Sequence, residues 1–410
     1  MKLLLRNARK VVTCSANGNL MKHGPEMNEV REIENADILV EDGIIEEIGK
    51  GIVDSDCEIV DVSDRLVIPG FIDPHTHLIF AGSREKEFEM RARGATYSEI
   101  AAGGGGILET VRSTREMPKS KLRNQAARRL EKMLRWGTTS IEIKTGYGLD
   151  FKNEVKMLET AAELKDESIQ DLVVTFLGAH AFPPEFANDR PAYVKLITDE
   201  MIPYASKKKL ADFCDVFCDS DFFSLEQAKT ILSLAAADGM KLKMHADELS
   251  SNGAADLAVE LGAVSVDHLE NISNSEIDRL ARSNSVGVVL PAVAAYLRTK
   301  PAPGREMIDR GCAIALATDF NPGTSMVDNM QTVMWLAVAM NSMSVEEALN
   351  AATINAAAAI GISDRTGSIE VGKKADMLIV NAPDYAYLPY HFTENRITNV
   401  VKDGKILEFS

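Results

Sequence analysis

The feature that most constrains the fold of this chain is a regular alternation of two kinds of segment in its middle part. Apolar runs typical of buried β-strands recur at residues 67–77, 138–146, 172–180, 211–219, 241–248, 263–270, 285–293 and 313–321. Helical segments lie between them, with apolar residues every three or four positions; examples are 120–137, 223–239 and 252–262. Eight strands alternating with helices predict an α/β fold, a (β/α)8 TIM-like barrel, whose usual length of roughly 250 residues fits.

The two ends of the chain show a different pattern. Short β-like runs there are separated by turn signals, such as Asp42-Gly43 near the start and Asp403-Gly404 near the end. We therefore expect residues 1–66 and 365–410 to form one small β-sandwich domain, with a barrel of residues 67–364 inserted between its halves. Two further helical segments, 328–340 and 344–361, are expected before the second half begins.

Composition excludes several classes of protein. The 410 residues include 45 basic and 61 acidic side chains, a net charge of −16, which argues against a nucleic-acid-binding protein. No run of about eighteen uninterrupted apolar residues predicts a membrane span. Charges at Arg6, Arg9 and Lys10 interrupt the first apolar run, so we expect no signal peptide and a cytoplasmic protein. The five scattered cysteines do not form a disulfide framework.

Chemically useful side chains gather where the predicted strands end. Active sites of such barrels lie at the C-terminal ends of the strands. In strand order these ends offer His75 and His77, Lys144 and Tyr147, His180, Cys218 and Asp219, His245 and Glu248, His268, and Asp319 with Asn321. Five of the seven histidines in the chain fall at these positions, which isolated structural histidines do not explain.

The histidines predict a metal site. Residues two apart in a strand face the same side, so His75 and His77 are expected to point together into the barrel mouth, with Asp73 as a group that orients a ligand. His245 and Asp319 complete a set of three imidazoles and one carboxylate, which suits zinc or iron. The fourth strand offers no lysine to bridge two ions, so we expect one metal ion.

Longer motifs carry a resemblance to a known family. PGFIDPHTH, MHADE, VDHLE and ALATDFNPGT resemble the amidohydrolase superfamily, and FAGSREKEFEMRARGATYSEI, IEIKTGYGL and FLGAHAFPPEF resemble its imidazolonepropionase family. The resemblance covers nearly the whole chain. It implies hydrolysis of the cyclic amide of 4-imidazolone-5-propanoate to N-formimidoyl-L-glutamate in histidine degradation, with one zinc or iron ion per subunit and a homodimer.

The same resemblance assigns roles to individual residues. The metal ligands would be His75, His77, His245 and Asp319. Arg84 would hold the substrate carboxylate, since a guanidinium fork suits that group. The other substrate-binding residues would be Tyr147, His180, Glu248, Asn321, Gly323 and Thr324. In the expected mechanism, metal-activated water attacks the ring carbonyl and Asp319 shuttles its proton, while His268 orients water or stabilises the oxyanion and Glu248 bonds the ring nitrogens.

Two alternatives remain open. A mononuclear deaminase acting on a heterocyclic amine would use the same histidines and aspartate, although Arg84 favours a substrate with a carboxylate. A non-enzymatic barrel scaffold is the second alternative, but such a protein is expected to have lost metal ligands. The glycine run at residues 103–106 is expected to belong to a loop that closes over the site, since glycines supply hinges.

Overall fold

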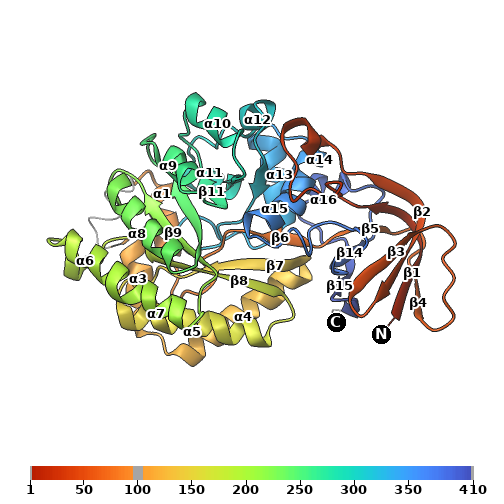
Figure 1. The fold of residues 1–410 in the computed structure, drawn as a ribbon, viewed down its shortest axis with the longest axis horizontal. Coiled ribbons are helices and arrows are strands. Elements are labelled where there is room, and N and C mark those ends of the chain that lie inside the picture. The colour runs from red at the N-terminus through yellow and green to blue at the C-terminus, as the bar shows by residue number, and fades with distance from the viewer. Residues whose placement is uncertain (1, 96–104, 408–410) are drawn as a thin grey trace.

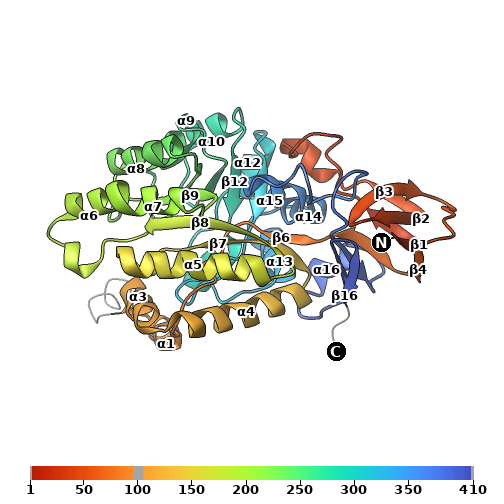
Figure 2. The same ribbon diagram turned by 60° about the horizontal axis from the view of Figure 1, so that its bottom comes forward.

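The computed structural model describes residues 2–95 and 105–407, and their strands form two separate sheets. In Figure 1 the larger body, whose strands are flanked by helices, lies beside a smaller sheet that carries both chain termini. Figure 2 shows the same two parts, with α4 and α5 running along the outside of the larger one. Among the described residues, no helix combines the length and apolar character needed to cross a bilayer.

The larger sheet is the predicted parallel barrel. Its strands follow each other in chain order: β6 (Phe71–Asp73), β7 (Thr138–Lys144), β8 (Asp171–Ala179), β9 (Phe213–Cys218), β10 (Lys241–Ala246), β11 (Ser265–His268), β12 (Val286–Val289) and β13 (Ile314–Leu316). A parallel bridge between Thr76 and Phe320, just beyond β6 and β13, joins the first strand to the last. All eight expected strands are therefore confirmed, in the expected order.

Helices cover the outside of the barrel, and β7 illustrates why, because every one of its residues is buried. The helices between the strands are α1 (Glu85–Ala92), α3 (Ile107–Glu116), α4 (Lys119–Arg135), α5 (Phe151–Glu167), α6 (Arg190–Leu196), α7 (Ile202–Lys207), α8 (Leu225–Ala237), α9 (Ala254–Glu260), α10 (Asn274–Leu280), α11 (Pro291–Leu297) and α12 (Gly304–Asp309). After the last barrel strand come α13 (Met330–Met340), α14 (Val345–Ala351), α15 (Ile354–Ala359) and α16 (Tyr387–Tyr390). Short segments of other helix types are η1 (Gly24–Asn28), η2 (Pro184–Phe186) and η3 (Ile197–Met201).

The smaller sheet is built from both ends of the chain, as expected. Its strands are β1 (Lys2–Val12), β2 (Glu32–Glu41), β3 (Ile44–Gly49), β4 (Glu58–Asp61), β5 (Leu66–Pro69), β14 (Met377–Val380), β15 (Ile397–Lys402) and β16 (Lys405–Leu407). It has its own apolar core, which joins Leu5 and Val67 from the first end to Met377 from the second. The division of the chain at residues 66 and 364 stays a prediction.

Two predictions about individual elements were wrong. The expected first barrel strand, 67–77, is broken at Gly70: β5 belongs to the small sheet and only β6 to the barrel. The backbone N–H of Gly70 bonds to Asp376 of the small sheet, and that of Phe71 bonds to Gly137 beside the barrel. The expected helix 344–361 is likewise two helices, because the chain breaks at Thr353, whose ψ of −98° is not helical.

Candidate active site

A cavity of about 460 Å³ lies at the C-terminal ends of the barrel strands. The predicted site residues on its wall are His77, Arg84, Tyr147, His180, His245, Glu248, His268, Asp319, Asn321 and Thr324. The other two, His75 and Gly323, lie directly behind it: His75 contacts His77 and His245, and Gly323 contacts Arg84. The barrel thus brings all the predicted site residues together from seven separate parts of the chain.

The four predicted metal ligands are close neighbours. Nε2 of His75 and Nε2 of His77 lie 3.5 and 3.4 Å from the same oxygen of Asp319. The ring centres of His75 and His245 are 4.6 Å apart, and those of His77 and His245 are 5.8 Å apart. All four side chains are almost completely buried.

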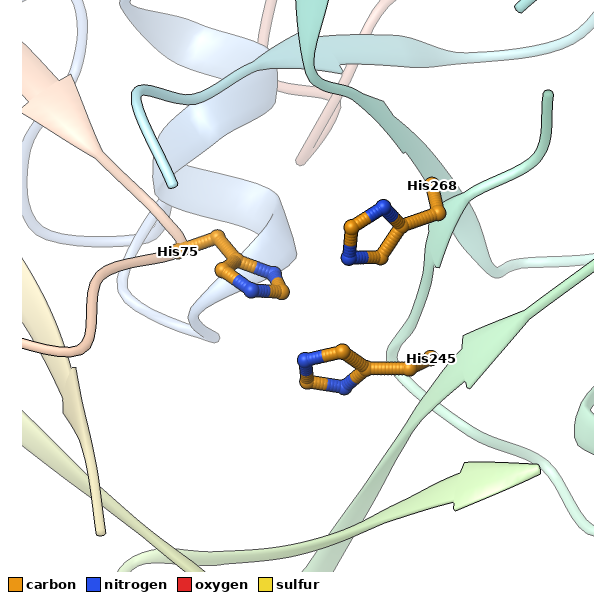
Figure 3. A group of neighbouring side chains, drawn as sticks. All are labelled: His75, His245 and His268. Carbon is orange, nitrogen blue, oxygen red and sulfur yellow. The ribbon is translucent and has the colours of Figure 1, made fainter. Parts of the chain in front are cut away.

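Two other histidines also adjoin this cluster. His268 groups with His75 and His245, and Figure 3 shows these three rings converging from separate strands. His180 groups with His77 and His245, stacking on His77 with ring centres 4.8 Å apart. Proximity alone therefore leaves His180 and His268 as further donors beside the predicted set.

The surroundings of the imidazoles distinguish them. Nδ1 of His75 bonds to Asp267 at 2.7 Å, and Nδ1 of His245 lies 2.9 Å from Asp215. These contacts direct Nε2 of both rings into the cluster, where neither nitrogen has a hydrogen-bond partner within the described residues. By contrast, His268 faces carboxylates on both sides, Glu248 at 3.6 Å and Glu270 at 3.7 Å.

These observations fit a bound metal ion. A buried polar atom without a partner is costly, and Oδ1 of Asp319 is another such atom in the described part of the chain. Burial lowers the pKa of His75, His77 and His245 well below its usual value, which keeps these rings neutral. Neutral imidazoles are what a metal ion binds, and His75 and His245 are also held by a carboxylate at their second nitrogen, as metal ligands commonly are.

A buried network of charges supports the cluster from below. Nζ of Lys144 lies 2.7 Å from Asp215, 3.2 Å from Asp267 and 3.0 Å from Glu142, and all four side chains are completely buried. Lys243 adds a second ammonium 3.0 Å from Glu142. Lys144, expected at a strand end, is thus a counter-ion for the carboxylates that hold the histidines.

Sequence analysis missed Asp215 and Asp267, and Asp73 acts on the backbone beside a predicted ligand rather than on an imidazole. We expected Asp73 to orient a metal ligand, but its carboxylate accepts hydrogen bonds from the N–H and hydroxyl of Thr318 at 3.1 and 2.6 Å. Asp73 therefore fixes the backbone immediately before Asp319. Asp267 stands directly before His268 in VDHLE, so the strand alternation alone did not mark it as a partner of His75.

The loop after β13 presents Asp319. Its backbone is in the left-handed region, with φ of 49°. Asn321 shapes the loop: its Nδ2 donates to the Asp319 carbonyl at 2.7 Å, and its Oδ1 accepts the N–H of Gly323 and of Thr324. The hydroxyl of Thr324 donates to the Asp319 carboxylate at 3.1 Å. Asn321 and Gly323, predicted to bind substrate, here build the turn that holds Asp319.

Arg84, Tyr147 and His180 lie on one cavity wall. Arg84 is buried and donates from Nε and Nη2 to one oxygen of Glu87, at 2.9 and 2.7 Å. The rings of Tyr147 and His180 are 5.5 Å apart, and Nδ1 of His180 lies 3.1 Å from the carbonyl of Gly146. Burial lowers the pKa of His180 to about 4, so this ring is a neutral contact surface at physiological pH.

The loop that we expect to close over the site lies largely outside the residues that the structure describes. Residues 96–104 are not among the described residues, and the glycine run at 103–106 overlaps them. Gly105 and Gly106 of this run are described, and the N–H of Gly106 donates to Glu87 at 2.9 Å. The closure therefore stays a prediction.

Comparison with known proteins identifies both a matching family and individual relatives. The sequence profile of the Amidohydrolase family matches residues 66–407. The imidazolonepropionase of Clostridium tetani is 43% identical over 99% of this chain and 98% of its own length. That of Geobacillus kaustophilus is 44% identical over 99% of this chain and 97% of its own length.

Solved structures share the fold at much lower identity. A mutant atrazine chlorohydrolase from Arthrobacter aurescens TC1, complexed with zinc and atraton, superposes with a TM-score of 0.75 at 19% identity, over 99% of this chain and 95% of that one. A Xaa-Pro dipeptidase with bound methionine gives 0.72 at 16% identity, over the whole of both chains. These two similarities concern the architecture alone.

Proposed function

The chain belongs to the amidohydrolase family, and within it to the imidazolonepropionases; from this premise we propose that it hydrolyses 4-imidazolone-5-propanoate to N-formimidoyl-L-glutamate, in histidine degradation. The observation that carries the proposal is the pairing of two groups on one cavity. Arg84 suits the propionate tail, and the cluster of His77, His245 and Asp319 suits attack on the cyclic amide.

We propose that His75, His77, His245 and Asp319 hold one zinc or iron ion. When bound, such an ion supplies a Lewis acid that acidifies water and polarises a carbonyl. The support is the geometry of the donors: unpartnered Nε2 atoms on His75 and His245, and an unpartnered oxygen on Asp319 within the described residues. Atomic spectroscopy of purified protein would identify the element, and a content far from one ion per chain would contradict the proposal.

The protein's own groups handle the proton. Asp319 would accept the proton of the attacking water and deliver it to the leaving ring nitrogen. The Thr324 hydroxyl bonded to its other oxygen keeps the carboxylate turned. Glu248, beside His268 on the cavity wall, would hydrogen-bond the ring nitrogens.

His268 would stabilise the oxyanion or orient the water. Because Glu248 and Glu270 face its two nitrogens, the ring is held as a donor. We expect His268→Ala to lower kcat by about two to three orders of magnitude, the usual cost of losing one oxyanion donor. The matched control is His391→Ala, a half-buried histidine outside the barrel; an H268A enzyme that keeps most of its kcat would refute this role.

A direct assay tests the proposed reaction. Metal-loaded protein is incubated with 4-imidazolone-5-propanoate, loss of its ultraviolet absorbance is followed, and the product is identified by mass. The rival deaminase would leave this compound unchanged and release ammonia from a heterocyclic amine, which would overturn the proposal.

We also propose a homodimer and a cytoplasmic location. The apolar segment of α13, expected to serve either an interface or barrel packing, buries Val333, Met334 and Ala337 within the chain, while Trp335 is partly exposed and stacks on Phe392 at 4.0 Å. Light scattering after size exclusion tests the dimer, and a monomeric mass would exclude it. Cell fractionation tests the location.

A further inference from the structure

Arg84 is already largely occupied by a partner from its own chain. Its Nε and Nη2 both donate to Oε2 of Glu87, so the edge of the guanidinium that best grips a carboxylate is taken. Nη1 is the nitrogen left over. It lies over the α-carbon of Gly323, so close that a β-carbon at that position would be 2.0 Å away. A substrate carboxylate on Arg84 therefore meets the Nη1–Nη2 edge, because Glu87 occupies the Nε–Nη2 edge.

A second arginine converges on the same glycine. Nη2 of Arg91 donates to the carbonyl of Gly323 at 2.9 Å, and its guanidinium lies 5.4 Å from the ring centre of Tyr296. Both Arg91 and Tyr296 line the same cavity as Arg84. Nε of Arg91 is buried and has no hydrogen-bond partner among the described residues. Two guanidiniums thus meet at Gly323, each with donor capacity left.

Among the residues that the structure describes, the charges around Gly323 do not balance. Arg84 and Arg91 bring two positive charges, and Glu87 brings one negative charge. The other carboxylates on the cavity wall, Glu248 and Asp319, belong to the histidine cluster. Burial, and then the neighbouring Arg84, lower the pKa of Arg91, which shows the cost of keeping this second cation here. A group in a cleft whose pKa is shifted in this way marks a candidate functional site.

We propose that Arg91 is a substrate-binding residue, which together with Nη1 of Arg84 forms a two-arginine site for the substrate carboxylate. This inference rests on the proposed function, because it assigns the propionate tail to the Gly323 end of the cavity. Glu87 sets the orientation of Arg84, and Arg91 supplies the donors and the net charge that Arg84 lacks. The pair explains how a chain with a net charge of −16 accepts an anionic substrate.

The competing explanation is that Arg91 has only a structural role. Its bond to Gly323 and its contact with Tyr296 tie α1 to the β13 loop and to α11, and that role needs no ligand. The loss of a purely structural contact would affect the kinetics of every substrate alike. If Arg91 instead binds the substrate carboxylate, its loss weakens binding only of substrates that carry that group. The two explanations therefore predict different kinetics for a neutral substrate.

The test compares two substrates in two variants. For 4-imidazolone-5-propanoate, Arg91→Met is expected to raise KM about tenfold to hundredfold, the range for losing a hydrogen bond to a charged group. Its kcat should stay within about threefold, since ground-state binding is what is lost. For the analogue with a neutral propanamide tail, R91M and the unchanged protein should have the same kcat/KM. Arg91→Lys should fall between them, because it keeps the charge without the fork.

Arg93→Met is the matched control, because Arg93 lies two residues further on, is exposed and pairs with Glu89. It should behave as the unchanged protein does with both substrates. If R91M lost the same factor in kcat/KM on the acid and on the amide, the inference would be overturned and Arg91 would have only a structural role. An unchanged KM for the acid would overturn it too. Failure of the proposed function looks different: the unchanged protein would then turn over neither compound.

Discussion

Gly323 is the residue where the proposed carboxylate site depends most directly on the absence of a side chain. A β-carbon there would lie 2.0 Å from Nη1 and 2.8 Å from Cζ of Arg84. We expect Gly323→Ala to displace the guanidinium and raise KM about tenfold or more, the cost of a lost charged hydrogen bond. Steady-state kinetics measures this effect. Gly49→Ala is the control, because nothing lies within 4 Å of its β-carbon; a G323A enzyme with an unchanged KM would contradict the prediction.

Lys144 stabilises the site through charge. Replacing it by methionine leaves Glu142, Asp215 and Asp267 buried without their shared ammonium. We expect Lys144→Met to lower the free energy of unfolding by about 3–5 kcal/mol, the usual result of removing one partner from a buried ion pair. Urea denaturation is the measurement. The exposed pair of Lys165 with Asp212 gives the control, since K165M should cost no more than about 1 kcal/mol.

At the residue scale, sequence patterns located the histidines but not their supports. His75, His77, His245 and Asp319 stand at strand ends, and strand ends of a parallel barrel meet in one place. Glu87 and Asp267 left no comparable signal. An acidic residue in a charged helix or beside a histidine is ordinary, and only the three-dimensional arrangement shows which basic group it faces.

At the element scale, the junction between β5 and β6 is a tight passage from one sheet to the other. A β-carbon on Gly70 would lie 2.3 Å from Oγ1 and 2.5 Å from Cγ2 of Thr139. We expect Gly70→Ala to destabilise the protein by about 1–3 kcal/mol, as overpacking does. Thermal unfolding measures it. Thr139→Ala removes both clashing atoms, so the double variant G70A/T139A should recover part of the loss; an additive double variant would show that the clash is not the cause.

The elements that sequence patterns predicted best are those whose signals are local. The Asp-Gly turns illustrate this: Asp42 and Gly43 join β2 to β3, and Asp403 and Gly404 join β15 to β16, all four with positive φ. The split of the helix at Thr353 depends instead on distant partners. Beyond the break, the amide of Asn355 bonds to the carbonyls of Lys22 and Ile314, which no local pattern indicates.

At the scale of the whole molecule, the metal ion should stabilise the fold. Its predicted ligands come from β10 and from the segments that directly follow β6 and β13, so a bound ion ties distant parts of the barrel together. An ion at one hundred times its dissociation constant adds about 2.7 kcal/mol. We expect chelation to abolish activity and lower Tm by several degrees, with zinc or ferrous iron restoring both. Differential scanning calorimetry measures the shift; a chelated protein with unchanged Tm and no metal would contradict the prediction, and Asp319→Asn should show a smaller shift.

The smaller sheet can be completed only late in the synthesis of the chain. β5 pairs with β14, yet roughly 300 residues of barrel separate them in the chain. At the usual pace of protein synthesis, the ribosome needs about 15–60 s to make that stretch. During this interval β5 has an unpaired side, and such an edge is a template for wrong partners. The sheet that begins with the first strands is therefore completed only when the last strands have been made. A chain cut short in translation would expose the unpaired edge of β5 to aggregation even if its barrel were complete.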